Sequence, residues 1–130
     1  MILSNEQREQ LRDALASRHR ELREEVRQDL LDTKDQHFVD LAGQVRDLEE
    51  ASVADLLVDI DLALIDKHID EIRDIDAALL RLRTGRYGVC ADCGEPVAPQ
   101  RLFAFPTAKR CRPCQEIYER SHAGHATPTL

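Results

Sequence analysis

Four cysteines, the only ones in the chain, are its clearest candidates for chemistry. They form two Cys-x-x-Cys pairs, Cys90 with Cys93 and Cys111 with Cys114, and 17 residues separate the inner members. Each pair can present two thiolates from one tight turn, and two such turns brought together supply the four sulfur ligands of a tetrahedral Zn²⁺ site. Because a four-thiolate site has no open coordination position, the ion would hold the fold together rather than activate water.

Disulfide bonds and thiol redox chemistry are the alternatives to a metal at these cysteines. The segment after Met1, Ile-Leu-Ser-Asn-Glu-Gln, is too short and too polar for a signal peptide, so we expect a cytoplasmic protein in a reducing compartment. A thioredoxin-like motif needs flanking βαβ units, and no strand is predicted upstream of Cys90. The five histidines are scattered, and we expect none of them to bind metal. The sequence therefore favours one structural Zn²⁺.

The chain of 130 residues is acidic, with a formal net charge of −7, 33% charged residues and 4% aromatic residues. This charge argues against a protein that holds nucleic acid mainly by attraction to the phosphates. No apolar run reaches the length of about 18 residues that predicts a membrane span. Most glycines and prolines lie from Gly85 onward, which is typical of long solvated helices followed by a short, turn-rich module.

A long helix is predicted from the N-terminal region to about Asp47. Ser4 followed by Gln7 fits a capping box, and no proline interrupts the segment. Its apolar residues are spaced by threes, fours and sevens: Leu11, Leu15, Leu22, Val26, Leu30, Leu41, Val45 and Leu48. So narrow an apolar stripe needs a partner helix.

The partner helix is predicted from about Val53 to Arg83, with Ser52 and Asp55 as its start signal. Its stripe has the same kind of spacing: Val53, Leu57, Ile60, Leu64, Ile65, Ile69, Ile72, Leu79 and Leu82. Residues 47–52 then form the turn of an antiparallel helical hairpin. The polar segment 33–36 is a rival turn or a local break in the seam.

The predicted turn is strongly acidic. From Asp47 through Asp66 the chain has seven carboxylates and no Lys or Arg. A solvated acidic helix face is the simpler explanation, but the run coincides with the expected end of the hairpin. The sequence therefore predicts an acidic tip.

The C-terminal third is predicted to be a small zinc module. Gly85 ends the second helix, and four apolar residues between the cysteine pairs are expected to pack around the metal: Val97, Leu102, Phe103 and Phe105. The fold class is thus mainly α. We expect a long helical hairpin over residues 1–86, a four-cysteine module with a short C-terminal helix over 87–121, and a loose tail over 122–130.

Two strings around the cysteines, Tyr87-Gly-Val-Cys-Ala-Asp-Cys-Gly-Glu-Pro-Val and Arg101-Leu-Phe-Ala-Phe-Pro-Thr-Ala-Lys-Arg-Cys-Arg-Pro-Cys-Gln115, closely resemble the zinc-finger signature of the DksA/TraR family of bacterial transcription regulators. The resemblance implies a protein that binds RNA polymerase rather than DNA. It implies that the hairpin enters the secondary channel and modulates transcription initiation, without catalysis of its own. We expect it to act as a monomer.

The family register places the tip motif, Asp-x-x-Asp-x-Ala, on residues 47–52. Asp47 matches the first acid, Glu50 stands in place of the second, and Ser52 replaces the alanine. A shorter-armed register at Asp61-Leu-Ala63 is the alternative, and the first is preferred because the helix start signal follows it.

Family members that respond to the alarmone ppGpp hold its phosphates with basic side chains at three positions. This chain has Asp74, Phe105 and Gln115 there. Phosphate needs cations or clustered amide donors, and a carboxylate repels it. We therefore expect weak or no coupling to ppGpp.

Other classes of protein remain as alternatives. GATA-type DNA-binding fingers share the cysteine spacing, and five residues could give a small basic face: Arg101, Lys109, Arg110, Arg112 and Arg120. No basic arm follows the last cysteine, so phosphate contacts would be few. A coiled-coil assembly protein with a zinc cap is a further alternative. An enzyme has little support, because no catalytic group or phosphate loop is recognisable.

Overall fold

A computed structural model describes residues 3–48, 53–57 and 63–122. This part of the chain contains six helices: α1 (Asn5–Asp32), α2 (Gln36–Asp47), α3 (Val53–Leu57), α4 (Ala63–Thr84), α5 (Pro99–Ala104) and α6 (Arg112–Ser121). The only β pairing among these residues is an isolated bridge between Val89 and Pro96. The predicted mainly α fold class is confirmed. None of the described helices is long and apolar enough to cross a membrane.

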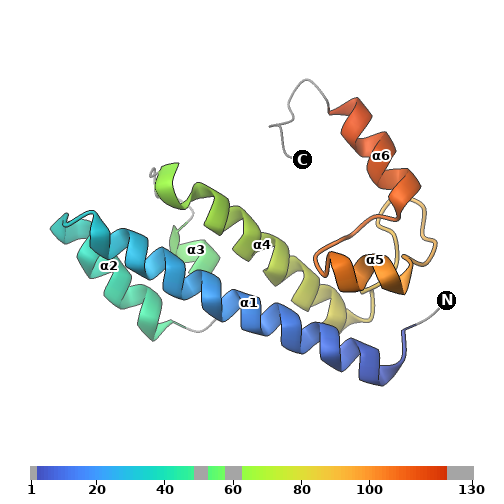
Figure 1. Cartoon of the computed structure of the whole chain (residues 1–130), viewed down its shortest axis with the longest axis horizontal. Coiled ribbons are helices and arrows are strands. Elements are labelled where there is room, and N and C mark those ends of the chain that lie inside the picture. Colours follow the sequence, from blue (N-terminus) through green and yellow to red (C-terminus); the bar gives the residue numbers. More distant parts are fainter. Residues whose placement is uncertain (1–2, 49–52, 58–62, 123–130) are drawn as a thin grey trace.

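Helix α1 is the central helix of a rod formed with α2 and α4, and it contacts both of them (Figure 1). It begins at the predicted capping box, in which the Gln7 amide donates to Ser4 Oγ at 3.0 Å and the Ser4 amide donates to Gln7 Oε1 at 2.9 Å. One face of the helix is buried along its whole length: Leu11, Leu15, His19, Leu22, Val26 and Leu30. These spacings of three and four residues are those of a packed amphipathic helix.

Helix α4 runs antiparallel to α1, as predicted. Its buried face is Ile65, Ile69, Ile72, Ile75 and Ala78. Two pairs of side chains fix the direction, because the later residue of α1 meets the earlier residue of α4. Asp29 Oδ2 lies 3.3 Å from His68 Nδ1, whereas His19 Nε2 lies 3.0 Å from Asp76 Oδ1.

The prediction of one continuous helix to Asp47 is wrong. Helix α1 ends at Asp32, the chain reverses through Thr33 and Lys34, and α2 begins after Asp35. Thr33 Oγ1 donates to the Leu30 carbonyl oxygen at 2.7 Å, and Asp35 Oδ1 accepts from the His37 amide at 2.9 Å. Short polar side chains of this kind offer backbone groups an alternative to the helix. The rival turn at residues 33–36 is therefore a real turn.

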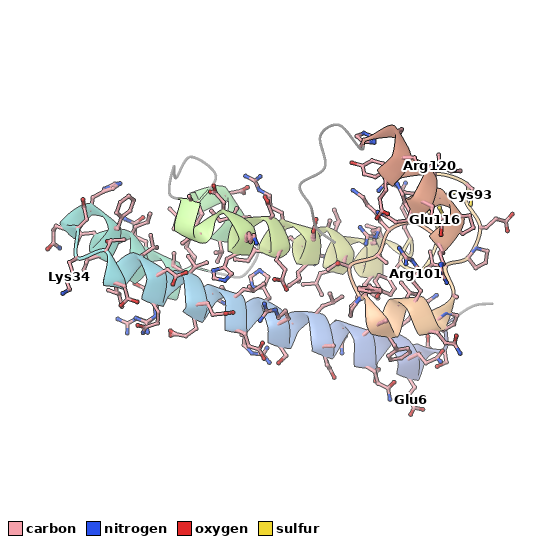
Figure 2. All side chains as sticks on the ribbon, turned by 45° about the horizontal axis from the view of Figure 1, so that its top comes forward. Glu6, Lys34, Cys93, Arg101, Glu116 and Arg120 are labelled. Atoms are coloured by element: carbon pink, nitrogen blue, oxygen red, sulfur yellow. The ribbon has the colours of Figure 1, made fainter. Side chains whose placement is uncertain are left out.

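Helix α2 folds back along α1 and buries Leu41, Ala42 and Val45. The Arg23 guanidinium, from the middle of α1, donates to the Leu48 carbonyl oxygen at 3.0 Å. The end of the rod is thus the turn that carries Lys34, on the opposite side of the molecule from Cys93 (Figure 2). Asp47 lies back along the rod, and residues 49–52 of the predicted turn lie outside the described residues.

The cap of α2 makes a testable contribution to this fold-back. Replacing Asp35 by Ala removes the side-chain acceptor for the His37 amide, so we expect a loss of about 1 kcal/mol in the free energy of unfolding. Urea denaturation followed by circular dichroism measures it. Asp13→Ala is the control, because Asp13 is exposed and its contact with Arg12 Nε is long at 3.8 Å. This variant should change the free energy of unfolding by less than about 0.5 kcal/mol. Equal effects of the two variants would contradict the assignment of the cap.

The zinc module lies beside the N-terminal end of α1 and the C-terminal end of α4 (Figure 1). Its buried apolar side chains are Tyr87, Val97 and Leu102, joined by Leu3. The prediction that Phe103 and Phe105 belong to this core is wrong, since they are 46% and 60% exposed. Helix α5 has only six residues, so one side chain, Leu102, faces inward. Tyr87 occupies the core instead, and its hydroxyl donates to the Pro106 carbonyl oxygen at 2.8 Å.

Candidate metal centre and helical arm

The four cysteines converge on one point of the zinc module. Their Sγ atoms all lie within 4.8 Å of one another, and Cys93 Sγ is 3.8 Å from Cys111 Sγ. A tetrahedral site with Zn–S bonds of about 2.3 Å has sulfur atoms about 3.8 Å apart. The donor set therefore fits a single structural Zn²⁺, held by Cys90, Cys93, Cys111 and Cys114.

Two turns position the ligands. The first turn contains Gly94 at φ +77°, a left-handed conformation that favours glycine, and its amide donates to the Cys90 carbonyl oxygen at 3.0 Å. The second pair begins α6, with Cys111 as the N-cap residue and Cys114 in the first turn. Negative charge on these sulfurs is favoured by the dipole of the helix that follows.

Contacts between the two turns hold the pairs together. Arg110 Nε donates to Asp92 Oδ2 at 2.8 Å, and the Ala91 amide donates to the Lys109 carbonyl oxygen at 2.8 Å. Asp92 and Ala91 lie inside the first Cys-x-x-Cys pair, whereas Arg110 and Lys109 precede the second. These contacts help to set the separation of the two pairs in the folded module.

The electrostatics of the sulfur cluster favour a cation. Burial on its own would raise the pKa of Cys90, but the backbone amides of Cys93, Cys111 and Asp92 outweigh it and lower the pKa to about 6. The pKa of Cys114 is raised, chiefly by its hydrogen bond with Cys111. Four thiols at these distances cannot all ionise without compensation. A divalent ion at the centre removes that conflict.

Comparison with known proteins places this module in a family. Residues 85–120 match the family model described as prokaryotic dksA/traR C4-type zinc finger. A relative from Haemophilus influenzae, named RNA polymerase-binding transcription factor DksA, is 31% identical over 127 residues, which cover 94% of this chain and 83% of the relative. The chain belongs to the DksA/TraR family. The resemblance found in the sequence is therefore confirmed.

Further DksA/TraR relatives match over different lengths. A Caulobacter vibrioides protein, also named RNA polymerase-binding transcription factor DksA, is 39% identical over 66 residues, or 51% of this chain and 46% of that protein. An uncharacterized Aquifex aeolicus protein is 42% identical over 52 residues, or 36% of its length. These two matches thus span less than half of each relative. The solved structure of transcription factor DksA2 from Pseudomonas aeruginosa is similar over 92% of this chain and 88% of that one, with a TM-score of 0.62 and 29% identity.

The three predicted tip residues of this DksA/TraR protein are only partly described. Asp47 is the last residue of α2 and is exposed, while Glu50 and Ser52 lie outside the described residues. Their assembly into a tip stays a prediction. The hydrogen bond from Arg23 on α1 to the Leu48 carbonyl oxygen places Asp47, the preceding residue, beside the middle of α1.

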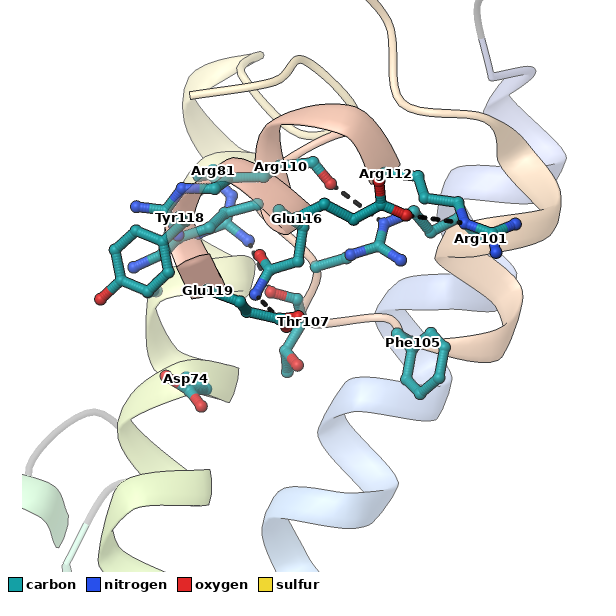
Figure 3. A pocket seen from close by; sticks show the side chains of 14 residues that line it. Asp74, Arg81, Arg101, Phe105, Thr107, Arg110, Arg112, Glu116, Tyr118 and Glu119 are labelled. Carbon is teal, nitrogen blue, oxygen red and sulfur yellow. Dashed lines mark hydrogen bonds and ion pairs between the residues drawn. The ribbon is translucent and has the colours of Figure 1, made fainter. Parts of the chain in front are cut away.

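The three positions associated with ppGpp in the family, Asp74, Phe105 and Gln115, line one cavity of about 740 Å³ (Figure 3). Five basic residues line it as well: Arg81, Arg101, Lys109, Arg110 and Arg112. Four of them belong to the basic face predicted from the sequence, and Arg81 was not predicted. Three acids oppose them: Asp74, Glu116 and Glu119. Burial raises the pKa of Asp74, and nearby Lys109 opposes the rise. The signal available in the sequence was the spacing of 74 and 81, which puts Arg81 on the same face of α4 as Asp74.

Proposed function

We propose that this chain is a DksA-like regulator that binds RNA polymerase directly and modulates transcription initiation by inserting its helical arm into the secondary channel. The observation that carries the proposal is a zinc-stabilised module at the base of an antiparallel helical rod, in a chain of the DksA/TraR family. Relatives named as RNA polymerase-binding factors supply the partner. The protein acts by contact, with no catalysis of its own.

Stiffness of the rod supports a role as an inserted arm. Arg18 on α1 donates from Nε to Glu71 Oε2 on α4 at 2.7 Å and also contacts Glu21 and Glu25 on its own helix. The hydrogen bond to Glu71 is the main reason that the pKa of Arg18 is raised. A side chain already ordered by one partner loses less conformational entropy on binding the next. The network therefore ties α1 to α4 near the middle of the two helices.

Charge supports the choice of partner surface. The acidic segment that begins at Asp47 suits a channel lined by basic groups and metal ions. The effector residues in this proposal are Asp47, Glu50 and Ser52. Because α2 folds back, the turn at Lys34 is the outermost part of the rod, and it competes with Asp47 as the leading surface.

A pair of variants separates these two surfaces. We expect Asp47→Asn/Glu50→Gln to abolish most of the effect on initiation, because both charges are removed without a change in side-chain size. Asp32→Asn, an exposed acid of the rod end, is the matched control and should retain the effect. In vitro transcription at saturating protein, with polymerase binding measured in parallel, gives the comparison.

If Asp32→Asn abolishes regulation and the double variant does not, the Lys34 turn is the tip. If the wild-type chain does not bind the polymerase, the proposed function is wrong. Direct sequence-specific DNA binding is not part of this function, and the chain acts as a monomer in the cytoplasm. The response to ppGpp is expected to be weak, because Asp74 stands where its phosphates would need a cation.

A further inference from the structure

One stretch of the zinc module has the opposite charge to the rest of the chain. Residues 96–115 contain four basic residues and no acid, in a chain of net charge −7. The basic residues are Arg101, Lys109, Arg110 and Arg112. The same stretch exposes two aromatic side chains, Phe103 at 46% and Phe105 at 60%. Exposed aromatic rings beside arginines are the combination enriched in protein interfaces.

A groove of about 650 Å³ lies within this stretch, between α5 and the start of α6. Its apolar lining comes from Pro96, Ala98, Phe105 and Pro113. Two arginines, Arg101 and Arg112, line it as well, together with Gln100 and the metal ligand Cys111. The volume suits one or two large side chains rather than a bound domain. The groove is therefore shaped for an anchor residue with charged neighbours.

The two arginines of the groove are available to a partner. Arg101 is held in place, since its Nε donates to the Arg110 carbonyl oxygen at 3.0 Å and its guanidinium carbon lies 5.8 Å from the Phe105 ring centroid. Within the described residues Arg101 has no ion pair with a carboxylate. Arg112 is 3.7 Å from Glu116, but its side chain is 83% exposed, so that contact is worth little. Both guanidinium groups are therefore open to carboxylates of a partner.

We propose that this groove docks an acidic segment of RNA polymerase that carries one apolar anchor side chain. The inference rests on the proposed function, in that it takes the polymerase as the partner. The anchor fills the space beside Phe105, and carboxylates on either side of it meet Arg101 and Arg112. The net charge of the chain is −7, and a second arginine-rich groove on the rod also contains Glu24, so the acid-free stretch of the zinc module is the surface that best complements an acidic segment. Docking of the zinc module would thereby orient the helical rod relative to the polymerase.

Nucleic acid is a poorer occupant for the same groove. Arg110 is already paired with Asp92 at 2.8 Å, which leaves few free cations for a phosphate backbone. The negative charge of the whole chain opposes that backbone further. Stacking of a nucleic-acid base on Phe105 would also need a continuous basic groove for the phosphates that follow, whereas the neighbouring rod is rich in acidic residues.

The test measures the affinity of full-length, zinc-loaded protein for purified RNA polymerase by fluorescence anisotropy. We expect Phe105→Ala to weaken binding about tenfold and Arg112→Gln about threefold, as is typical of an anchor residue and of a charged residue beside it. Matched controls are Phe103→Ala, a 46% exposed ring of α5 outside the groove, and Arg120→Gln, an exposed arginine of α6. Both controls should change affinity by less than about twofold. Zinc content and circular dichroism verify the fold of each variant.

Outcomes of this experiment separate the inference from the proposed function. Wild-type binding with unchanged affinity for both groove variants overturns the docking site and leaves the regulator standing. No binding by the wild type overturns both. If a single-stranded oligonucleotide displaces the polymerase, the groove binds nucleic acid and the proposal is overturned. If the protein sediments as a dimer that Phe105→Ala dissociates, the groove binds a second copy of the chain, and the proposal is overturned as well. If Arg112→Lys binds the polymerase with an affinity close to that of the wild type while Arg112→Gln binds more weakly, the contact depends on the positive charge.

Discussion

Removal of zinc is expected to unfold residues 87–122 while α1 and α4 remain paired. Among the described residues the module buries Tyr87, Val97, Leu102 and the metal ligand Cys90, together with Leu3, and this core is too small to fold unaided. In zinc-finger peptides the apparent free energy of zinc binding is about 10–16 kcal/mol, and it is the free energy of folding. Chelation, or Cys111→Ser, should therefore expose Arg101 and Lys109 to trypsin. Metal analysis should find one zinc per chain before chelation.

Tyr87 reports the same transition through its ionisation. In the folded module burial raises the pKa of Tyr87 to about 12, against about 10 in an unfolded chain. Folding therefore favours the neutral phenol, and this contribution is complete below about pH 10 and is lost as the pH rises toward 12. Chelation should move the ionisation of Tyr87, followed by ultraviolet absorbance, to about pH 10. Ser121→Ala is the control for Cys111→Ser. An unchanged tryptic pattern and an unchanged Tyr87 titration after verified loss of zinc would contradict a metal-dependent module.

Local signals in the sequence were sufficient for the two helices of the seam and for the metal ligands. The capping box at Ser4 and the apolar stripe of α1 are properties of neighbouring residues, and the structure has them where expected. The stripe of α4 is confirmed at Ile65, Ile69 and Ile72 and continues through Ile75 and Ala78. Leu79 and Leu82 are only partly buried, and the predicted Ile60 lies outside the described residues. The cysteine spacing likewise fixes a ligand set without knowledge of the rest of the chain. Each of these features depends on contacts within a few residues or on a metal with strict geometry.

The fold-back of α2 depends instead on competition between two packed states. The apolar stripe continues from Leu30 to Leu41 and Val45, so its spacing suits one long helix as well as two shorter ones. What distinguishes them is the burial of Leu41 and Val45 against α1 together with the caps at Thr33 and Asp35. Tertiary packing of this kind overrides helix propensity, and it cannot be read from the periodicity of one strip of residues.

The sequence predicted a small basic face near the cysteines, but it did not predict the cavity and the groove that this face lines, or the contribution of Arg81. Arg81 comes from α4, Arg101 from α5, and Arg112 from α6. Only the zinc-fixed arrangement of three elements gathers these charges on one side of an acidic protein. Phe103 and Phe105 seemed to be core residues because the module is so short of apolar side chains. Because they are exposed instead, they give the zinc module an apolar and basic surface that can bind a partner.

The pair between His19 and Asp76 is expected to contribute more to the stability of the rod than any exposed ion pair. His19 is completely buried, and its Nε2 lies 3.0 Å from Asp76 Oδ1, while Nδ1 has no hydrogen-bond partner among the described residues. Asp76→Ala leaves both ring nitrogens unsatisfied, so we expect the free energy of unfolding to fall by about 2–3 kcal/mol.

Replacing both members of the pair tests this account of the seam. His19→Leu/Asp76→Leu removes the buried polar groups together, so its free energy of unfolding should lie within about 1 kcal/mol of the wild type. The urea midpoint would then recover, while the antiparallel register would lose the polar contact of its fully buried histidine; a single polar pair specifies register in coiled coils in the same way. The control is Arg12→Ala, whose contact with Asp13 is exposed and which should cost less than about 0.5 kcal/mol. A double variant as unstable as Asp76→Ala would show that His19 acts through the shape of its ring rather than through the pair.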